Sequence, residues 1–393
     1  MPRRLLLLVG VASFVLALNL RMGISSVGPV LPRVVHDLGA GLVYGSLLTT
    51  LPVVMMGLMS PWSARLAVRW GLEWSIVGAL LVITVAVGLR LWTDNPWLLL
   101  VTALGLGAGI AAGNTILPAV VGTYFPAYTA LMTGMYTVGM NIGAGAAAYG
   151  TPRLADQLSS TWRGGLAVWA IPALLAAGLW AIVALRVHRP PRALAAIRTS
   201  GRSRQVALVA LLFGLQSMTY YGVLAWLAPL YEERGWAADR AGLLISILTG
   251  TQIVGSLAAA VVVQRTGRLV GGLRLAAVTF GAALLLVALT PTSAPWLWAV
   301  ALGLGSGAIF TLALTVPLQV TDSVDAGRQL TSRMLCYGYL MAATGPLIVS
   351  VLRSASGGFV VAFLLLAGLC AAASMIARSV VHSAALTSPH GPE

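Results

Sequence analysis

Twelve apolar runs, separated by short charged or glycine- and proline-rich breaks, occupy most of this sequence. A helix needs roughly 20 apolar residues to cross the hydrocarbon core of a bilayer, and each run has about that length. Hydrophobic residues make up 59% of the chain and charged residues 9%, whereas about a quarter of the residues in a soluble domain are charged. The pattern excludes a soluble globular enzyme, a disordered chain and a collagen-like chain, and it predicts an all-α polytopic membrane protein with twelve transmembrane helices.

Six of these helices are predicted in each half of the chain. In the first half they span residues 5–31, 44–66, 74–92, 97–121, 128–150 and 164–186. In the second half they span residues 205–230, 241–263, 273–291, 295–320, 330–352 and 357–378.

The longest polar connection divides the chain near its midpoint and is rich in arginine. A segment of this kind could bind anionic lipid on the cytoplasmic side, or it could serve only as a linker between two bundles. The predicted domains are an N-terminal six-helix bundle (1–187), a basic cytoplasmic linker (188–204), a C-terminal six-helix bundle (205–380) and a cytoplasmic tail (381–393).

The basic residues fall mostly in connections on the same side as the N-terminus. Cytoplasmic connections of membrane proteins are enriched in basic residues, so we expect both termini in the cytoplasm. Arg90, at the end of the third predicted helix, is assigned to the opposite side together with the arginines of the outer connections. The basic excess is explained by this orientation, and no nucleic-acid partner is expected.

The two halves of the chain contain a repeated sequence. Residues 103–109, ALGLGAG, recur as ALGLGSG at residues 301–307, an offset of about 198 residues, with a Pro-Trp pair before and a proline after each copy. Two six-helix halves related as parallel repeats are the organisation of major-facilitator transporters. Gly105, Gly109 and Gly113 repeat every four residues on one helix face and predict close helix packing. A phosphate-binding loop would need a preceding strand, which an apolar span does not supply.

Arg21 lies well inside the first predicted helix. An arginine at the centre of a bilayer costs at least about 2.5–3.5 kcal/mol on insertion scales, and arginine does not deprotonate to escape that cost. One explanation is a structural ion pair, but the predicted spans hold no Asp or Glu near the midplane. We therefore expect Arg21 to face the bundle interior and to recognise an anionic or electron-rich substrate.

Polar side chains in other spans could complete a substrate site with Arg21. Ser25 lies four residues from Arg21 and shares its helix face. Gln216 and Tyr220 share one face of the seventh predicted helix and are the preferred partners. Each of these groups could instead make an interhelical hydrogen bond. The predicted substrate-binding residues are Arg21, Gln216, Tyr220, Asn114, Tyr136, Asn19 and Ser25.

Other residue types limit the chemistry of the chain. The four histidines fall outside the predicted spans, and Cys336 and Cys370 lie in apolar stretches with no disulfide or zinc spacing. We expect no metal, no cofactor and no dedicated proton-binding carboxylate in the cavity, which leaves uniport, exchange and symport open. Arg333 opens the eleventh predicted helix. It is expected to reach the interface, with Asp322 or Asp325 as a partner, or to line the inner vestibule.

The first helix, with Asn19-Leu20-Arg21 followed by SVGPVLP at 26–32, resembles that of the cyanate permease and 2-nitroimidazole transporter family of major facilitators. Further matches lie at 51–57, 169–173, 214–217, Tyr220, 225–227, 351–354 and Gly357. The resemblance implies a monomeric twelve-helix transporter of the bacterial inner membrane, with a central site reached alternately from each side. Met22 stands where the family often has proline, and Asn114 where relatives carry glutamine.

These observations together predict a secondary active or facilitative transporter that moves a small anionic or polar planar solute by alternating access. The solute would be cyanate-like, nitrate-like or nitroimidazole-like. One alternative is a drug or metabolite efflux pump of the same fold, and another is a transporter-derived sensor that binds ligand without flux. A membrane-embedded enzyme would need facing histidine, cysteine or acidic clusters, which the predicted spans do not offer.

Overall fold

A computed structural model of the chain describes residues 3–40, 42–157, 161–187, 203–321 and 323–385. Within these residues the regular secondary structure is entirely helical, and at least one α-helix overlaps each of the twelve predicted ranges. Most of the predicted linker, residues 188–202, and most of the predicted tail, residues 386–393, lie outside the described residues.

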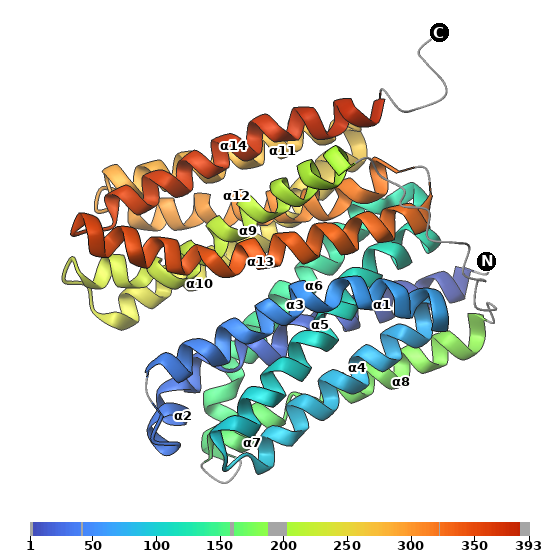
Figure 1. The fold of residues 1–393 in the computed structure, drawn as a ribbon, viewed down its shortest axis with the longest axis horizontal. Helices are drawn as coiled ribbons and strands as arrows, with labels where there is room; N and C mark the ends of the chain where they lie inside the picture. Colours follow the sequence, from blue (N-terminus) through green and yellow to red (C-terminus); the bar gives the residue numbers. More distant parts are fainter. Residues whose placement is uncertain (1–2, 41, 158–160, 188–202, 322, 386–393) are drawn as a thin grey trace. The chain divides into compact units, whose positions relative to one another are not determined.

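The helices of the first half alternate long spans with short connecting turns (Figure 1). They are α1 (Arg3–Ser25), η1 (Gly28–Val30), α2 (Leu31–Asp37), α3 (Leu42–Trp70), α4 (Leu72–Gly88), η2 (Leu89–Trp92), α5 (Pro96–Tyr124), η3 (Pro126–Tyr128), α6 (Thr129–Gln157), α7 (Trp162–Ala167) and α8 (Ala170–Val187). The second half contains α9 (Ser203–Glu232), α10 (Ala238–Thr266), α11 (Leu269–Leu289), α12 (Pro295–Gln319), α13 (Val324–Ser356) and α14 (Val360–Ala385).

Eleven helices of the described residues are long and apolar enough to cross a membrane. The remaining long helix, α6, has 29 residues and covers the predicted range 128–150, but its glycines, threonines and polar side chains lower its hydropathy. A polar, glycine-rich helix of this length is stable in a membrane when neighbouring helices cover it. The chain is therefore a multi-pass membrane protein.

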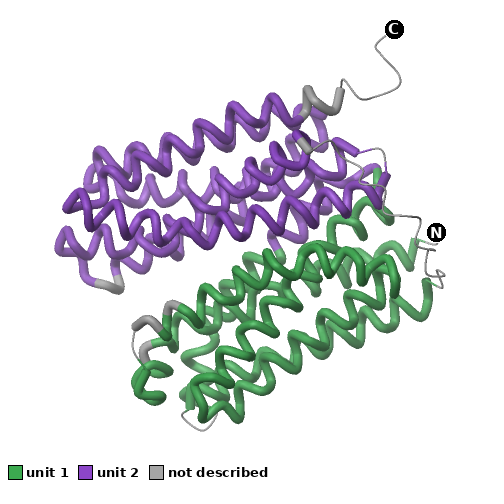
Figure 2. Tube along the Cα trace, in the orientation of Figure 1, with its two compact units in different colours: residues 1–126, 139–199 green, residues 127–138, 200–393 purple. Residues whose placement is uncertain are grey.

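The chain forms two compact units (Figure 2). Unit 1 comprises residues 1–126 and 139–199, and unit 2 comprises residues 127–138 and 200–393. The boundary passes through α6, whose first turns pack within unit 2. There the Gln264 side-chain amide donates a hydrogen bond of 2.7 Å to the Ala127 carbonyl. The hydroxyls of Thr137 and Thr311 share a hydrogen bond of 2.8 Å.

Glycines set the close packing around α1 in unit 1. A Cβ atom on Gly113 of α5 would overlap the Leu20 side chain, and one on Gly143 of α6 would overlap the Leu18 backbone. On Gly109 it would lie 2.6 Å from Ile83 of α4. These contacts confirm that the glycine face of α5 serves helix packing, and they place α1 against both α5 and α6.

The first predicted helix, 5–31, is shorter in the structure because α1 ends at Ser25. Pro29 has no N–H to continue the helical ladder, and a proline disfavours helical conformation at the residue before it. The predicted range merged η1 with α1, and the chain continues from η1 into α2, of which the prediction included only the first residue. The end of α1 therefore lies one turn after Arg21.

Candidate substrate-binding site

Arg21 is half-buried on α1 of unit 1. Its neighbour Leu20 packs against Gly113 of α5, so Arg21 and Asn114 lie at the same level of the unit. Asn114 is 8% exposed, and Ser25, the last residue of α1, is half-buried. The structure thus brings three of the predicted site residues to one region of unit 1.

Asn19 belongs to the packed face of α1. Its side chain is 2% exposed, and its amide nitrogen donates a hydrogen bond of 2.9 Å to the Val15 carbonyl. The side-chain oxygen of Asn19 makes no hydrogen bond within the described residues. Because the donor is used by the helix backbone and the residue is buried, Asn19 supports the helix rather than presenting a donor to solvent.

Gln216, Tyr220 and Tyr136 belong to unit 2. Gln216 on α9 is 1% exposed, and its amide nitrogen donates a hydrogen bond of 2.5 Å to the Ser217 hydroxyl. Tyr220 lies one turn further along α9 and meets the ring of Tyr221 edge-on, with centroids 5.4 Å apart. Tyr136 on α6 is buried, and its hydroxyl makes no hydrogen bond within the described part of the chain. Unit 2 therefore holds its own set of buried polar groups.

Arg90 is a buried cation whose burial the sequence analysis did not predict. It was assigned to the outer side of the membrane, and its side chain is fully buried in unit 1. Its Nη1 donates a hydrogen bond of 2.9 Å to the Gly23 carbonyl of α1, and its Nε lies 3.4 Å from the Thr102 hydroxyl of α5. Its Nη2 has no partner within the described residues. The position of Arg90 near the end of an apolar run gave no sign that neighbouring helices cover it.

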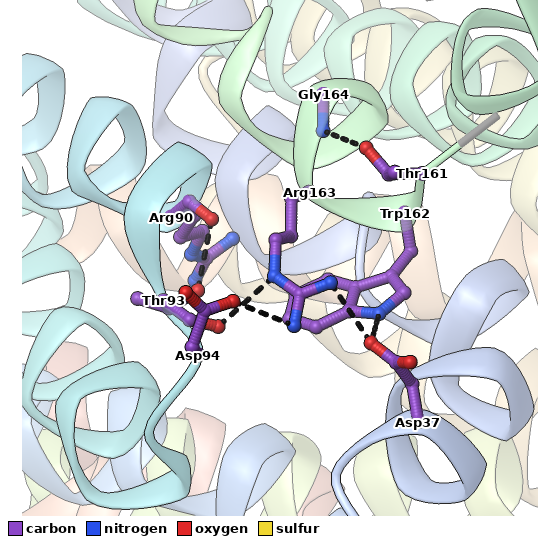
Figure 3. A network of polar contacts seen from close by, with 8 residues as sticks. All are labelled: Asp37, Arg90, Thr93, Asp94, Thr161, Trp162, Arg163 and Gly164. Carbon is purple, nitrogen blue, oxygen red and sulfur yellow. Dashed lines mark hydrogen bonds and ion pairs between the residues drawn. The ribbon is translucent and has the colours of Figure 1, made fainter. Parts of the chain in front are cut away.

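A network of ion pairs joins α2, η2 and α7 in unit 1 (Figure 3). Arg163 contacts Asp37 at 2.8 Å and Asp94 at 3.1 Å, and its Nε donates a hydrogen bond of 3.2 Å to the Thr93 carbonyl. The Trp162 ring nitrogen donates a further hydrogen bond of 2.9 Å to Asp37. Hydrogen bonds from Trp162 and Arg163 to the charged form lower the pKa of the Asp37 carboxyl below its usual value.

The network continues toward α1 (Figure 3). The Thr93 hydroxyl donates a hydrogen bond of 2.8 Å to the Arg90 carbonyl. Through Arg90, contacts therefore run from Asp37 at the end of α2 to Gly23 in the last turn of α1.

The sequence analysis also did not identify a buried acidic residue. Glu73, in the first turn of α4, is 7% exposed and accepts a hydrogen bond from the Tyr124 hydroxyl at the end of α5. It lies one residue before the predicted range 74–92, so boundary placement concealed it.

Arg333 lies deeper in its helix than predicted. Since α13 begins at Val324, Arg333 is in the third turn of the helix, where it is half-buried. Asp325 pairs with Arg328 at 3.2 Å, and Asp322 lies outside the described residues.

No group of three or more histidines, cysteines or acids within the described residues could hold a metal ion. The predicted site residues carry guanidinium, amide and hydroxyl groups, which recognise solutes by hydrogen bonding and charge.

The fold and these groups define a polytopic transporter. The Major Facilitator Superfamily profile matches residues 11–346. The chain is 32% identical to the cyanate transport protein CynX of Escherichia coli K12 over 88% of this chain and 89% of that protein. It is 29% identical to the 2-nitroimidazole transporter of the same organism over 94% of this chain and 95% of that protein.

The human organic anion transporter MFSD10 has a similar fold, with a TM-score of 0.76 and 14% identity over 96% of this chain and 100% of that chain. The chain belongs to the major facilitator superfamily and is a transporter.

Proposed function

We propose that this transporter moves a small anionic or polar planar solute by alternating access, with Arg21 as the main electrostatic contact. The relatives named for cyanate and 2-nitroimidazole transport support a substrate of this size and shape. The observation that carries the proposal is a guanidinium on α1 that is half-buried among membrane-spanning helices. A planar guanidinium presents five N–H donors in a fork that suits a planar anion.

Asn114 and Ser25 support the proposal in unit 1, because both lie near Arg21 and carry hydrogen-bonding groups. In unit 2 the buried amide of Gln216 and the ring of Tyr220, one turn apart on α9, are proposed as further contacts to the solute. Aromatic rings and amides of this kind bind flat polar molecules through ring contacts and hydrogen bonds.

We propose further that the transporter lies in the bacterial inner membrane as a monomer, with both termini in the cytoplasm. The bias of basic residues toward one side supports this orientation.

Uptake of labelled cyanate into proteoliposomes tests the proposed function, with nitrate, 2-nitroimidazole and acetate as competitors. Wild-type vesicles should accumulate cyanate, at least one competitor should reduce it, and Arg21→Gln should abolish it. Arg4→Gln is the matched control, because Arg4 is an exposed arginine on the same helix. Cyanate uptake that survives Arg21→Gln would contradict the role of Arg21. Uptake of none of these solutes would redirect the search to larger anions and to export.

A further inference from the structure

The last turn of α1 has a carbonyl that its own helix does not satisfy. The Val27 N–H, which would bond to Gly23 in a continuing helix, instead bonds to the Ile24 carbonyl at 3.2 Å. The Gly23 carbonyl accepts its hydrogen bonds from the Ser26 hydroxyl at 3.1 Å and from Arg90 Nη1 at 2.9 Å. Arg90, 67 residues away in the chain, therefore caps the C-terminal end of α1.

Stability does not explain a charge at this position. Arg90 is fully buried, and no carboxylate of the described residues pairs with it. Burying a charge is costly unless it is both paired and hydrogen-bonded, and Arg90 has hydrogen bonds but no ion pair among the described residues. Burial of this guanidinium, whose Nη2 makes no hydrogen bond within the described residues, therefore lowers the stability of the fold.

The internal repeat shows that bundle packing does not need a cation here. Next to Arg90 the offset is 199 residues, from Pro96 to Pro295, so the equivalent of Arg90 is Leu289, the last residue of α11, which is 59% exposed and carries no charge. In the same comparison α9, the equivalent of α1, continues without a break to Glu232. The arginine occurs in the half whose first helix ends early, and it contacts that end.

The end of α1 is also electrostatically unfavourable for an anion. The C-terminal carbonyls of a helix carry a partial negative charge, which falls off within the last turn. Arg21 lies one turn before Ser25, so a solute held by Arg21 would lie close to those carbonyls. A cation bound to one of them offsets that negative charge.

We propose that Arg90 is a positioning residue for the anion site. Its guanidinium fixes the last turn of α1, and with it Arg21 and Ser25, and it cancels the negative end of the helix that would otherwise repel the solute. The inference rests on the proposed role of Arg21. In this proposal Arg90, which lies in η2, affects solute binding without touching the solute.

The test measures initial rates of cyanate, nitrate and acetate uptake into proteoliposomes for Arg90→Met and Arg90→Lys. We expect Arg90→Met to raise KM about tenfold, the effect of losing one charge-assisted hydrogen bond, with little change in the maximal rate per reconstituted transporter. Arg90→Lys keeps the charge and should recover most of the affinity. Thr102→Val, which removes the partner of Nε but leaves the bond to Gly23, should retain a KM close to that of the wild type.

A double-mutant cycle separates positioning from a merely structural effect. In the Arg21→Gln background, where uptake should be lost, Arg90→Met should cause no further loss of affinity, measured as the dissociation constant of nitrate in equilibrium binding to the purified proteins. Hydrogen exchange over residues 20–30 should be faster in Arg90→Met than in the wild type.

Faster exchange without a change in KM would mean a structural cap only and would overturn the inference. A fall in the maximal rate of Arg90→Met with an unchanged KM would do the same. If Arg21→Gln has normal affinity, or if none of the three anions is taken up, the proposed function fails and this inference fails with it. Loss of affinity in Arg21→Gln but not in Arg90→Met refutes only the inference.

Discussion

Replacing Gly143 by alanine tests the close approach of α6 to α1. A Cβ atom on Gly143 would lie 2.8 Å from the carbonyl carbon of Leu18 and 2.9 Å from its Cα, and nearer still to its carbonyl oxygen. These are backbone atoms, so no side chain can rotate out of the way. Carbon atoms pack at about 3.5–4.0 Å, which means that α1 must retreat from α6 by about 1 Å.

Two effects of opposite sign determine the stability change. Overpacking of a close contact costs about 1–3 kcal/mol, while alanine gains about 0.8–1.0 kcal/mol over glycine as a helix former. We therefore expect Gly143→Ala to lower the free energy of unfolding by about 0–2 kcal/mol relative to the wild type and by about 1–3 kcal/mol relative to an alanine that meets no close contact. Gly145→Ala is the matched control, because a Cβ atom there meets nothing within 4 Å. It should be neutral or slightly stabilising.

The assay is denaturant unfolding of the purified protein in detergent, followed by tryptophan fluorescence, together with cyanate uptake. Arg21 lies one turn after Leu18 on α1, so the retreat of α1 should also raise KM in Gly143→Ala. Equal stability of the Gly143→Ala and Gly145→Ala proteins would refute the packing argument for α1 and α6.

Three further outcomes are expected. The pKa of the Asp37 carboxyl lies below its ordinary value of 3.8, so its contacts with Trp162 and Arg163 stabilise the protein fully above that pH and less as the pH falls through the folded-state pKa. Asp37→Asn should therefore lower the melting temperature at pH 7, and the difference should shrink below pH 3.8 in a thermal unfolding series. Tyr124→Phe removes the hydroxyl that donates to buried Glu73 and should cost about 1–3 kcal/mol of unfolding free energy, part of which Glu73→Gln should restore. A cytoplasm-specific reporter fused to the C-terminus should be active, whereas activity of a periplasmic reporter at that end would contradict the proposed orientation.

Hydropathy predicted the helices because each span must present an apolar surface to lipid over a fixed length. The prediction of 295–320 differs from α12 (Pro295–Gln319) by a single residue. Hydropathy missed the end of α1, where Pro29 is the local signal for the break and the residue that binds the last turn is distant in the sequence. The end of α1 at Ser25 is completed by Arg90, which no local pattern near Ser25 reveals.

The site was predicted in part for a similar reason. Arg21 stands out because it is a charge inside an apolar run. The glycine spacing of α5 predicted close packing, but only the structure shows that α1 is the helix that packs against Gly113. Arg90 and Glu73 were overlooked because each lies at the margin of a run, where hydropathy cannot distinguish an exposed residue from one that a neighbouring helix covers. Their roles depend on tertiary contacts with Gly23 and Tyr124.

The ion pairs of Arg163 also bear on how this chain can be engineered. The ion pair with Asp37 joins connections that are 126 residues apart, and the hydrogen bond to the Thr93 carbonyl joins connections that are 70 residues apart. In the sequence these are three separate connections, but in unit 1 the contacts of Arg163 join them to one another. An epitope or reporter inserted into the α2, η2 or α7 segment should therefore displace the other two segments as well. Through Arg90, the displacement should also reach the end of α1, the helix that carries Arg21.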